Sequence, residues 1–417
     1  MVTISGSVLV MQLVEKHIIS RTHWLYPQLN NLCFLSKNLF NYANYLIRQK
    51  FIATGEYLNY YQVDKLAAGT PDYIALPAKV SQQTLLRLHE SWKSFFQATA
   101  TYNQQKSLFE SRPKLPKYKH KTAGRNVVTY TQQAISKTWL KKGIIHLSKT
   151  SIFLPTRVKA VNQVRIVPKT YHIVVEVVYE VLQSGGSNDG TEAIAGIDIG
   201  LNNLATIVSN QAGLKPVIVN GRPLKALNAY YNKQKAKSQS CLPKNQKTSK
   251  KIQRLTHKRN CKIDNYLHNA SRFIIDCLVA NRIGTLVIGK NDGWKQSINL
   301  GKRNNQNFVS VPHARFIKML TYKAQLAGME VIITEESYTS KCSLLDNEPI
   351  GKHSLYQGRR IKRGLFRASD GTCINADVNG SANIVRKVFP NAFAEGIQGV
   401  VVRPVRVTPY KTTRCGK

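Results

Sequence analysis

Four acidic residues stand where predicted strands end or a predicted helix begins. Asp198 comes at the exit of an apolar, β-branched stretch, Glu335 and Glu336 follow a second such stretch, and Asp377 opens a helical pattern. Because the strands of a parallel α/β sheet end at one edge, we expect these carboxylates to gather there. Two or three carboxylates can hold a pair of divalent cations that promote phosphodiester hydrolysis. Asp198, Glu335, Glu336 and Asp377 are therefore the candidate catalytic and metal-binding residues.

The two neighbouring glutamates are alternatives rather than partners. Successive side chains of an extended chain point to opposite faces, so only one of Glu335 and Glu336 is expected to reach the other acids. The sequence does not choose between them. Asp292, which follows a third apolar stretch at 285–288, is a weaker candidate for the same role.

Charge separates this chain from an ordinary globular protein. Lysine and arginine number 61 against 22 aspartates and glutamates, which gives a formal net charge of +39 in 417 residues. So many positive charges repel one another in a compact chain. Binding to a polyanionic partner, above all nucleic acid, would explain why the chain carries them. A membrane surface is the competing partner, but we find no apolar run of the ~18 residues that a spanning helix needs.

Nine basic residues in two segments are expected to contact phosphate groups. One segment, residues 112–121, contains two prolines that exclude a regular helix or central strand, and we call it the basic segment. A second, which we call the basic loop, follows at residues 359–363. The candidates are Arg112, Lys114, Lys117, Lys119, Lys121, Arg359, Arg360, Lys362 and Arg363.

The remaining pattern predicts a multidomain α+β protein. Apolar residues three to four apart predict two long helices near 26–52 and 81–105, and short alternating stretches around them predict an antiparallel β-barrel. From residue 191 strands alternate with helices, as in an α/β domain. The predicted parts are a barrel (1–25 and 108–184), a helical insertion (26–107), an α/β domain (191–389) with an inserted loop (338–374), and a poorly ordered basic tail (390–417).

Three motifs occur in a specific order: Gly196 to Ala205, Tyr338 to Lys341, and Asn375 to Ile384. In this combination the chain resembles the TnpB family, transposon-encoded RNA-guided DNA nucleases related to type V CRISPR effectors. The resemblance implies a RuvC-like nuclease domain with an RNase H fold and a wedge barrel carrying a helical recognition insertion. The inserted loop would bind the target nucleic acid. Asp198 would match the first RuvC acid and Asp377 the third.

The same resemblance implies cofactors and partners. They are Mg²⁺ (or Mn²⁺) at a two-metal site, a transposon-derived guide RNA, and a target double-stranded DNA with a short flanking motif. One protein per RNA and a prokaryotic cytoplasm or nucleoid are expected, with no membrane partner. The seven cysteines, an odd number without any C-x-x-C pair, favour reduced thiols and agree with this compartment.

Two departures from the family pattern bear on activity and folding. Relatives usually place the second acid, a glutamate, where this chain has Gly289, so we hypothesise that Glu335 or Glu336 replaces it from the neighbouring strand. Strands of a sheet lie ~4.8 Å apart, a distance that a glutamate side chain spans. Many relatives carry two C-x-x-C pairs in the inserted loop, but only Cys342 and Cys373 remain, so a structural zinc ion is not expected.

Three other functions fit parts of the pattern. Gly289 makes an RNA-guided DNA-binding protein without nuclease activity the main alternative. A sugar-kinase-like or actin-like ATPase shares the Gly-x-Asp-x-Gly strand, but we find no second glycine-rich phosphate loop, and a net charge of +39 suits a small nucleotide poorly. A cut-and-paste transposase also uses three carboxylates, but the motifs at 338–341 and 375–384 favour the TnpB family.

Overall fold

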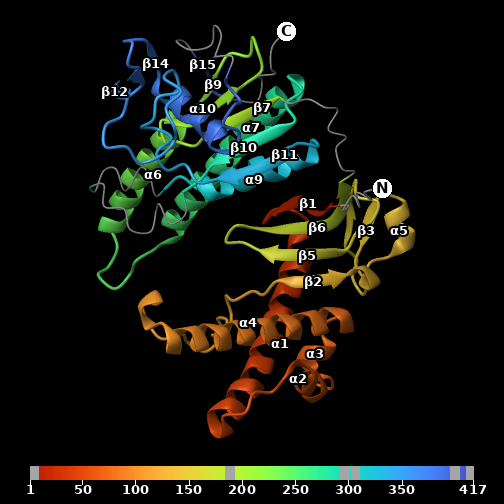
Figure 1. The fold of residues 1–417 in the computed structure, drawn as a ribbon. Coiled ribbons are helices and arrows are strands. Elements are labelled where there is room, and N and C mark those ends of the chain that lie inside the picture. The colour runs from red at the N-terminus through yellow and green to blue at the C-terminus, as the bar shows by residue number, and fades with distance from the viewer. Residues whose placement is uncertain (1–8, 184–192, 292–300, 302–309, 395–403, 410–417) are drawn as a thin grey trace, which may run out of the picture. The chain divides into compact units, whose positions relative to one another are not determined.

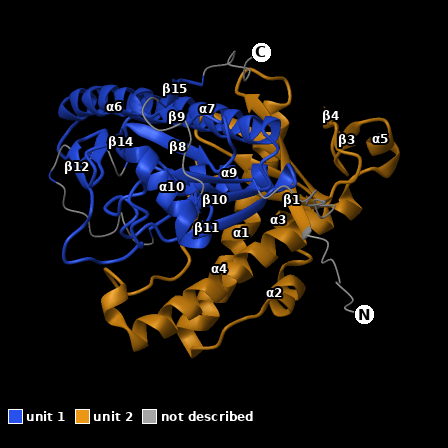
Figure 2. Cartoon of the chain, turned by 45° about the horizontal axis from the view of Figure 1, so that its top comes forward, with its two compact units in different colours: residues 1–9, 183–417 blue, residues 10–182 orange. Residues whose placement is uncertain are grey.

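The fold was analysed in a computed structural model of the chain, which describes residues 9–183, 193–291, 301, 310–394 and 404–409. The chain divides into two compact units, residues 10–182 (unit 2) and residues 1–9 with 183–417 (unit 1) (Figure 2). Each unit is described by itself below.

Long helices dominate the first half of unit 2 (Figure 1). Helix α1 (Tyr26–Thr54) and helix α4 (Ala78–Gln104) lie where the apolar periodicity predicted them. Between them the chain forms the short helices α2 (Tyr60–Ala67) and α3 (Pro71–Ile74), and a 3-10 turn, η1 (Lys106–Leu108), follows α4. The core between the long helices is aromatic: Trp92 is fully buried, and its indole N–H donates to Asn44 Oδ1 at 3.0 Å.

The strands of unit 2 form a four-stranded sheet in the order β1-β6-β5-β2 and a separate two-stranded ribbon. The strands are β1 (Leu9–Ser20), β2 (Val128–Thr131), β3 (Ile144–His146), β4 (Phe153–Pro155), β5 (Gln163–Pro168) and β6 (His172–Gln183). The 3-10 turn η2 (Gln132–Ala134) and helix α5 (Lys137–Lys141) lie between β2 and β3. The β5 pairings with β6 and with β2 are antiparallel, as predicted, while closure into a barrel stays a prediction.

Unit 1 is built on a six-stranded mixed sheet in the order β11-β10-β7-β8-β9-β15. Its strands are β7 (Ile194–Asp198), β8 (Asn203–Ser209), β9 (Val217–Asn220), β10 (Thr285–Gly289), β11 (Glu330–Thr334) and β15 (Val405–Val407). Strand β7 runs parallel to β10, which runs parallel to β11, and it is antiparallel to β8. The carboxyl ends of β7, β10 and β11 therefore meet at one edge.

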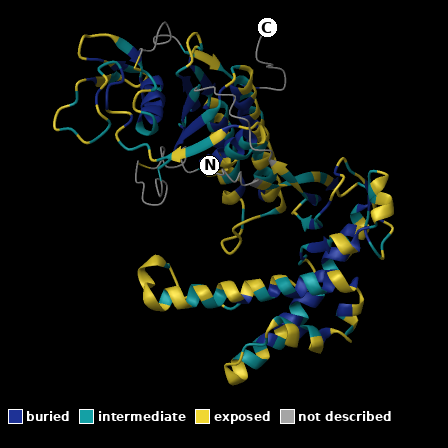
Figure 3. Cartoon of the chain, turned by 45° about the vertical axis from the view of Figure 1, so that its right-hand side comes forward, coloured by how far each residue is buried: buried dark blue, intermediate teal, exposed yellow. Residues whose placement is uncertain are grey.

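Helices cover both faces of this sheet. The helices are α6 (Arg222–Ser240), α7 (Lys250–Ala280), α9 (His313–Leu326) and α10 (Ala376–Val388). Ala195 and Ile197 of β7 join a core with apolar residues of α7 and α9. On the opposite face α10, which is buried along most of its length (Figure 3), packs on β7, β8 and β10.

The approach of α10 to the sheet depends on small residues. A Cβ on Gly196 would lie 2.4 Å from Val385 Cγ2 and 2.6 Å from the Ser381 carbonyl oxygen, so no larger residue fits there. The hydroxyl of Ser381 lies 2.9 Å from the carbonyl oxygens of both Gly196 and Thr206, and it ties the helix to two adjacent strands. Because side chains alternate along β7, Asp198 points to the same face as Gly196, toward α10.

Two expectations from the sequence need correction. The tail after residue 390 was expected to be poorly ordered, but Val405–Val407 forms β15, parallel to β9, because its backbone groups pair with an otherwise open sheet edge. Reduced thiols were expected throughout, but Cys277 is disulfide-bonded. The free cysteines among the described residues are Cys33, Cys241, Cys261, Cys342 and Cys373.

The residues between β11 and α10 carry a three-stranded antiparallel sheet, β12 (Arg359–Lys362), β13 (Leu365–Arg367) and β14 (Cys373–Asn375). Its core residue Phe366 is buried against Ile374 and Val378. Strand β14 leads directly into α10, so this small sheet is joined to the helix that carries Asp377. Across the described part of the chain, none of the helices combines the length and apolar character that crossing a lipid bilayer requires.

Candidate active site

Asp198 ends β7 and lies beside α10. A Cβ on Gly380 of α10 would lie 3.2 Å from Asp198 Oδ2, which shows how closely the helix approaches the carboxylate. Burial first, and then the nearby carboxylates of Glu336 and Asp377, raise the pKa of Asp198 to about 8, while the charge of Arg360 opposes this rise. A carboxyl group in such surroundings holds its charge only with a cation beside it.

Glu336 lies two residues beyond the end of β11 and reaches toward β10. In the parallel register Thr334 pairs with Gly289, and a Cβ on Gly289 would lie only 3.0 Å from Glu336 Oε2. The other oxygen, Oε1, accepts a hydrogen bond from Asn291 Nδ2 at 2.9 Å. Within the described part of the chain, Glu336 Oε2 is buried with no hydrogen-bond partner, and burial raises the pKa of this carboxyl to about 7.

Glu335 lies in different surroundings. Its side chain is 66% exposed and forms a long ion pair, 3.7 Å, with Lys387 Nζ. The alternation of side chains along an extended chain predicts that Glu335 and Glu336 point to opposite sides. The structure brings Glu336, and not Glu335, to Asp198. The third sequence candidate, Asp292, lies outside the described residues.

Asp377 occupies the first turn of α10, where the helix dipole favours a negative charge. Asn375 caps this helix by accepting the backbone N–H groups of Asp377 and Val378 at 3.0 and 3.2 Å. The carboxylate itself is held on both oxygens, since Asn203 Nδ2 donates to Oδ2 at 2.5 Å and an Arg360 guanidinium N–H donates to Oδ1 at 3.1 Å. Asn203 therefore connects β8 to the acid on α10.

We call Asp198, Glu336 and Asp377 the acidic site. Within the described ranges no three His, Cys, Asp or Glu side chains converge closely enough to form a ready-made metal centre. The chemistry of the three carboxylates nevertheless fits a hard cation such as Mg²⁺, which prefers oxygen ligands. Oε2 of Glu336 is buried without a partner among the described residues, and the pKa of Asp198 is raised. Both observations indicate that the described side chains do not balance the negative charge these two carboxylates would carry when ionised.

Two residues that hold the acids were missed by the sequence reasoning. Asn203 and Asn291 each donate to a carboxylate of the acidic site from another strand or strand end. Asn203 lies within the motif from Gly196 to Ala205, but the motif alone does not predict its hydrogen bond to Asp377. Asn291 carried no signal beyond following a predicted strand.

The inserted loop is organised by polar side chains. Glu348 is only 2% exposed, and its carboxylate accepts the backbone N–H groups of Ser343 at 2.7 Å and Gln357 at 3.1 Å. Arg386 of α10 donates to the Glu348 carbonyl oxygen at 3.2 Å. Two further buried residues of α10, Asn379 and Asn383, donate to the carbonyl oxygen of Cys342. The loop is thus tied both to itself and to α10.

Replacing Glu348 with alanine is expected to destabilise unit 1 by about 2–3 kcal/mol, because the buried N–H of Ser343 and the partly buried N–H of Gln357 both lose their carboxylate acceptor. Urea unfolding of the purified chain measures this loss, and proteolysis within 338–374 should become faster. Glu330→Ala is the matched control, since Glu330 is exposed at the start of β11. Equal midpoints for the two variants would contradict the organising role of Glu348.

The basic segment in unit 2 is fastened to α1 through its backbone. Four side chains of α1, spaced along one face, donate to its carbonyl oxygens: Lys37 to Lys121 (2.6 Å), Asn41 to Lys119 (2.8 Å), and Asn44 and Arg48 to Pro116 (3.0 Å each). Asn41 Oδ1 also accepts the Lys119 N–H at 2.9 Å. The basic segment is therefore an extended stretch of chain whose backbone is held along α1.

The basic candidates differ in how they present their charge. In the basic segment Arg112, Lys114, Lys117 and Lys121 are exposed, as are Arg359, Lys362 and Arg363 of the basic loop. Lys119 is half-buried with its ammonium 4.8 Å from the centre of the Phe40 ring, and burial lowers its pKa. Arg360 is directed at Asp377. All nine candidates except Lys119 are thus exposed, and Arg360 differs from the other seven exposed residues in pairing with Asp377.

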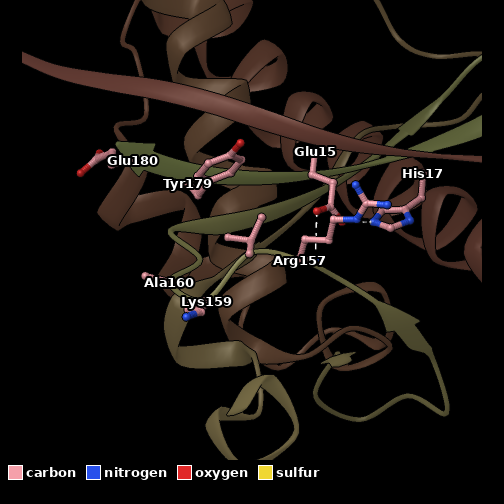
Figure 4. A pocket seen from close by; sticks show the side chains of 8 residues that line it. Glu15, His17, Arg157, Lys159, Ala160, Tyr179 and Glu180 are labelled. Atoms are coloured by element: carbon pink, nitrogen blue, oxygen red, sulfur yellow. Dashed lines mark hydrogen bonds and ion pairs between the residues drawn. The ribbon is translucent and has the colours of Figure 1, made fainter. Parts of the chain in front are cut away.

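A cavity of about 710 Å³ in unit 2 carries charges of both signs (Figure 4). Glu15 is already engaged there, since it bonds His17 Nε2 at 2.7 Å and accepts the backbone N–H of Arg157 at 3.1 Å. Lys159 and Glu180 add one charge of each sign. The cavity shares no residue with the acidic site or the basic segment.

Two family models match the second half of the chain. The model OrfB_IS605, described as "Probable transposase", matches residues 172–295, which include Asp198 and Gly289. The model "Cas12f1-like, TNB domain" matches residues 313–384, which include Glu336, the inserted loop and Asp377. All three residues of the acidic site therefore lie in matched regions.

Curated relatives point the same way. The chain is 27% identical over 213 residues to the CRISPR-associated endodeoxyribonuclease Cas12f2 of Micrarchaeota archaeon (strain CG1_02_47_40), covering 47% of this chain and 37% of that protein. It is 29% identical over 133 residues to the endodeoxyribonuclease Cas12f1 of Sulfoacidibacillus thermotolerans, covering 31% of this chain and 28% of that protein. The matched part spans about a third of the length of these relatives.

Among solved structures, a Cas12f1–sgRNA–target DNA complex aligns over 90% of this chain and 98% of that chain, at 16% identity and a TM-score of 0.36. The two family models, which do not depend on that alignment, cover the segments of the acidic site. The chain is a TnpB-like relative of the type V CRISPR effectors.

Proposed function

We propose that the protein is an RNA-guided DNA endonuclease of a transposable element. In this proposal unit 1 is a RuvC-like nuclease domain of RNase H type, and unit 2 is a wedge domain with a helical recognition insertion. A transposon-derived guide RNA pairs with one strand of double-stranded DNA next to a short flanking motif. The observation that carries the proposal is the placement of Asp198, Glu336 and Asp377 at one edge of the sheet, beyond the ends of β7 and β11 and at the start of α10, in a chain of net charge +39.

Asp198, Glu336 and Asp377 would hold the divalent metal ions. Bound in a pair, such ions activate a water molecule and stabilise the leaving oxygen of a phosphodiester. The protein supplies rigid placement: α10 fixes Asp377 in its first turn, and Asn203 orients that carboxylate from β8. The close packing of α10 on β7 holds Asp198 and Asp377 on one face of the sheet.

Arg360 would bridge the nucleic acid and the acidic site. Its guanidinium reaches Asp377, while its neighbours Arg359, Lys362 and Arg363 are exposed. An arginine between phosphates and carboxylates screens the repulsion that a polyanionic substrate meets at an acidic site. The target strand would therefore approach the acids along the basic loop.

The exposed charges of the basic segment would contact the phosphates of the guide RNA or the DNA. An open groove of about 410 Å³, lined by Phe95 and Ser94 of α4 and by Lys114 and Lys117, lies beside the segment. Phosphate contacts position the nucleic acid, and base pairing with the guide supplies the sequence specificity. The chain then needs no base-specific contact beyond the flanking motif.

RNA binding is expected to weaken at least ~10³-fold between 50 and 200 mM salt, because six or more phosphate contacts release counterions. Fluorescence anisotropy with labelled flanking transposon RNA measures this dependence. Replacing Lys114, Lys117 and Lys121 together with glutamine should reduce the slope. The same change at Lys244, Lys247 and Lys251, three exposed lysines outside the basic segment, is the charge-matched control. An affinity that does not change with salt would contradict a phosphate-based interface.

The proposal is tested by cleavage of a plasmid library with a fixed target and randomised flanks. The protein is co-expressed with its flanking transposon RNA and assayed in Mg²⁺, with Asp198→Ala, Asp377→Ala and EDTA alongside. We expect cleavage next to a recurring flank, lost in both variants and in EDTA, with RNA affinity unchanged. Cleavage that survives Asp377→Ala would remove this residue from the site.

A second candidate function is RNA-guided DNA binding without cleavage. Two observations favour it: Gly289 stands where relatives usually carry an acid, and both oxygens of Asp377 are already bonded to Asn203 and Arg360. Under this alternative the library experiment yields protection of the target from nuclease digestion, dependent on guide and flank, with no cut product. The two outcomes separate the candidates directly.

A further inference from the structure

The end of β10 holds a second feature next to the acidic site. Gly289 is its last residue, and Asn291 follows two positions later. Asn291 exchanges two hydrogen bonds with Glu336: its Nδ2 donates to Oε1 at 2.9 Å, and its Oδ1 accepts the Glu336 backbone N–H at 3.3 Å. One asparagine thus fixes both the backbone and the carboxylate of the same glutamate.

Gly289 supplies the space that this carboxylate enters. A Cβ at this position would lie 3.0 Å from Glu336 Oε2 and 2.5 Å from Ile384 Cδ1 of α10. Ile384 is itself fully buried, so it has little room to withdraw. Any side chain at 289 would therefore crowd Glu336 from one side and the helix from the other.

We infer that Asn291 is a positioning residue for Glu336 and that Gly289 is the space required for it. The inference rests on the proposed function, because it concerns the metal-binding role of Glu336. Asn291 holds Oε1 by a hydrogen bond. Oε2, which lies close to Gly289 and has no hydrogen-bond partner among the described residues, is left as the oxygen that would bind the ions. Glu336, accommodated by the glycine at the end of β10 and held by the asparagine that follows it, then supplies the carboxylate that β10 itself lacks.

The test is a double-mutant cycle read by Mn²⁺ binding to the full chain, using electron paramagnetic resonance of free Mn²⁺. Asn291→Ala is expected to weaken Mn²⁺ binding ~10-fold, the usual cost of losing a partner that orients a ligand. In a Glu336→Gln background the same change should have no further effect, because the group it positions is gone. Asn281→Ala, before the start of β10, is the control; among the described residues its Nδ2 bonds the Cys277 carbonyl oxygen at the end of α7, at 2.7 Å, and not an acid of the site.

Gly289→Ala is the companion variant. It should also weaken Mn²⁺ binding, and adding Ile384→Val, which removes the clash with α10, should restore the melting temperature but not the Mn²⁺ affinity. Recovery of both would mean that Gly289 serves packing alone and would overturn its part of the inference.

The result that overturns the role of Asn291 is an equal effect of Asn291→Ala in both backgrounds, or none in either. Failure of the proposed function looks different: Mn²⁺ binding would be insensitive to Asp198→Asn in the otherwise unaltered chain. Binding that depends on Asp198 but not on Asn291 leaves the metal site standing and removes only the inference.

Discussion

Glu336→Gln is expected to abolish metal-dependent cleavage, with a loss of more than ~100-fold, while Glu335→Gln stays within about twofold. The expected loss exceeds the 10–100-fold cost of a partner that only orients a ligand, because a ligand itself disappears. Glutamine keeps the size of the side chain but not its charge, so packing against Gly289 is preserved. Glu335 pairs at 3.7 Å with Lys387 near the surface, and an exposed pair of this kind contributes little.

The measurement is single-turnover cleavage of a plasmid by the complex with guide RNA, at saturating Mg²⁺. RNA affinity and far-ultraviolet circular dichroism of each variant show that folding and assembly are intact. The reverse order, with Glu335→Gln inactive and Glu336→Gln active, would mean that the residues after β11 change their register when nucleic acid binds. Activity in both variants would leave the site with two acids.

The metal-free protein is expected to lose stability as the pH rises from about 5 to about 8.5. The folded-state pKa of Asp198 is raised to about 8 and that of Glu336 to about 7, both by burial first. A raised pKa means that the folded chain binds more protons than the unfolded one at intermediate pH, so its advantage is full at low pH. That advantage is lost as the pH passes through these values, at about 1.4 kcal/mol per pKa unit.

Urea unfolding at a series of pH values, in EDTA and in Mg²⁺, measures this dependence. Asp198→Asn should flatten the curve in EDTA and raise stability at pH 8 by on the order of 2 kcal/mol. Lys323, whose pKa burial lowers to about 8, titrates with the opposite sign. It is present in both proteins, so the difference between them isolates Asp198. Mg²⁺ should stabilise the unaltered chain at pH 8 and leave Asp198→Asn unchanged; identical curves would argue against uncompensated charge.

Local patterns were sufficient for much of the fold. In α1 and α4, apolar residues three to four apart fall on one face only if the chain is helical. Strands β7, β10 and β11 are apolar runs that are too short for helices. Both kinds of element lie where the sequence predicted them. Strand β15 was missed because a segment of three residues, two of them exposed, is too short to carry a pattern of its own. It forms a strand because β9 offers a free edge.

The acidic site shows the same division. The sequence singled out all three acids as candidates, because a carboxylate at the end of an apolar strand or the start of a helix is itself a local signal. It could not choose between Glu335 and Glu336, since that choice depends on how the chain turns after β11. Partners such as Asn203 and Asn291 come from distant parts of the sequence, and only the register of β7, β8, β10 and β11 brings them to the acids.

Because α1 holds the basic segment by its carbonyl oxygens, the exposed lysines take no part in keeping it in place. Lys114, Lys117 and Lys121 can therefore be exchanged without altering the path of the chain. Substitutions at these positions would change how strongly, and at which points, the surface binds a nucleic acid. The asparagines of α1 would still hold the backbone of the basic segment in its path. Under the proposed function, this arrangement would let the interface change one side chain at a time as the guide RNA diverges.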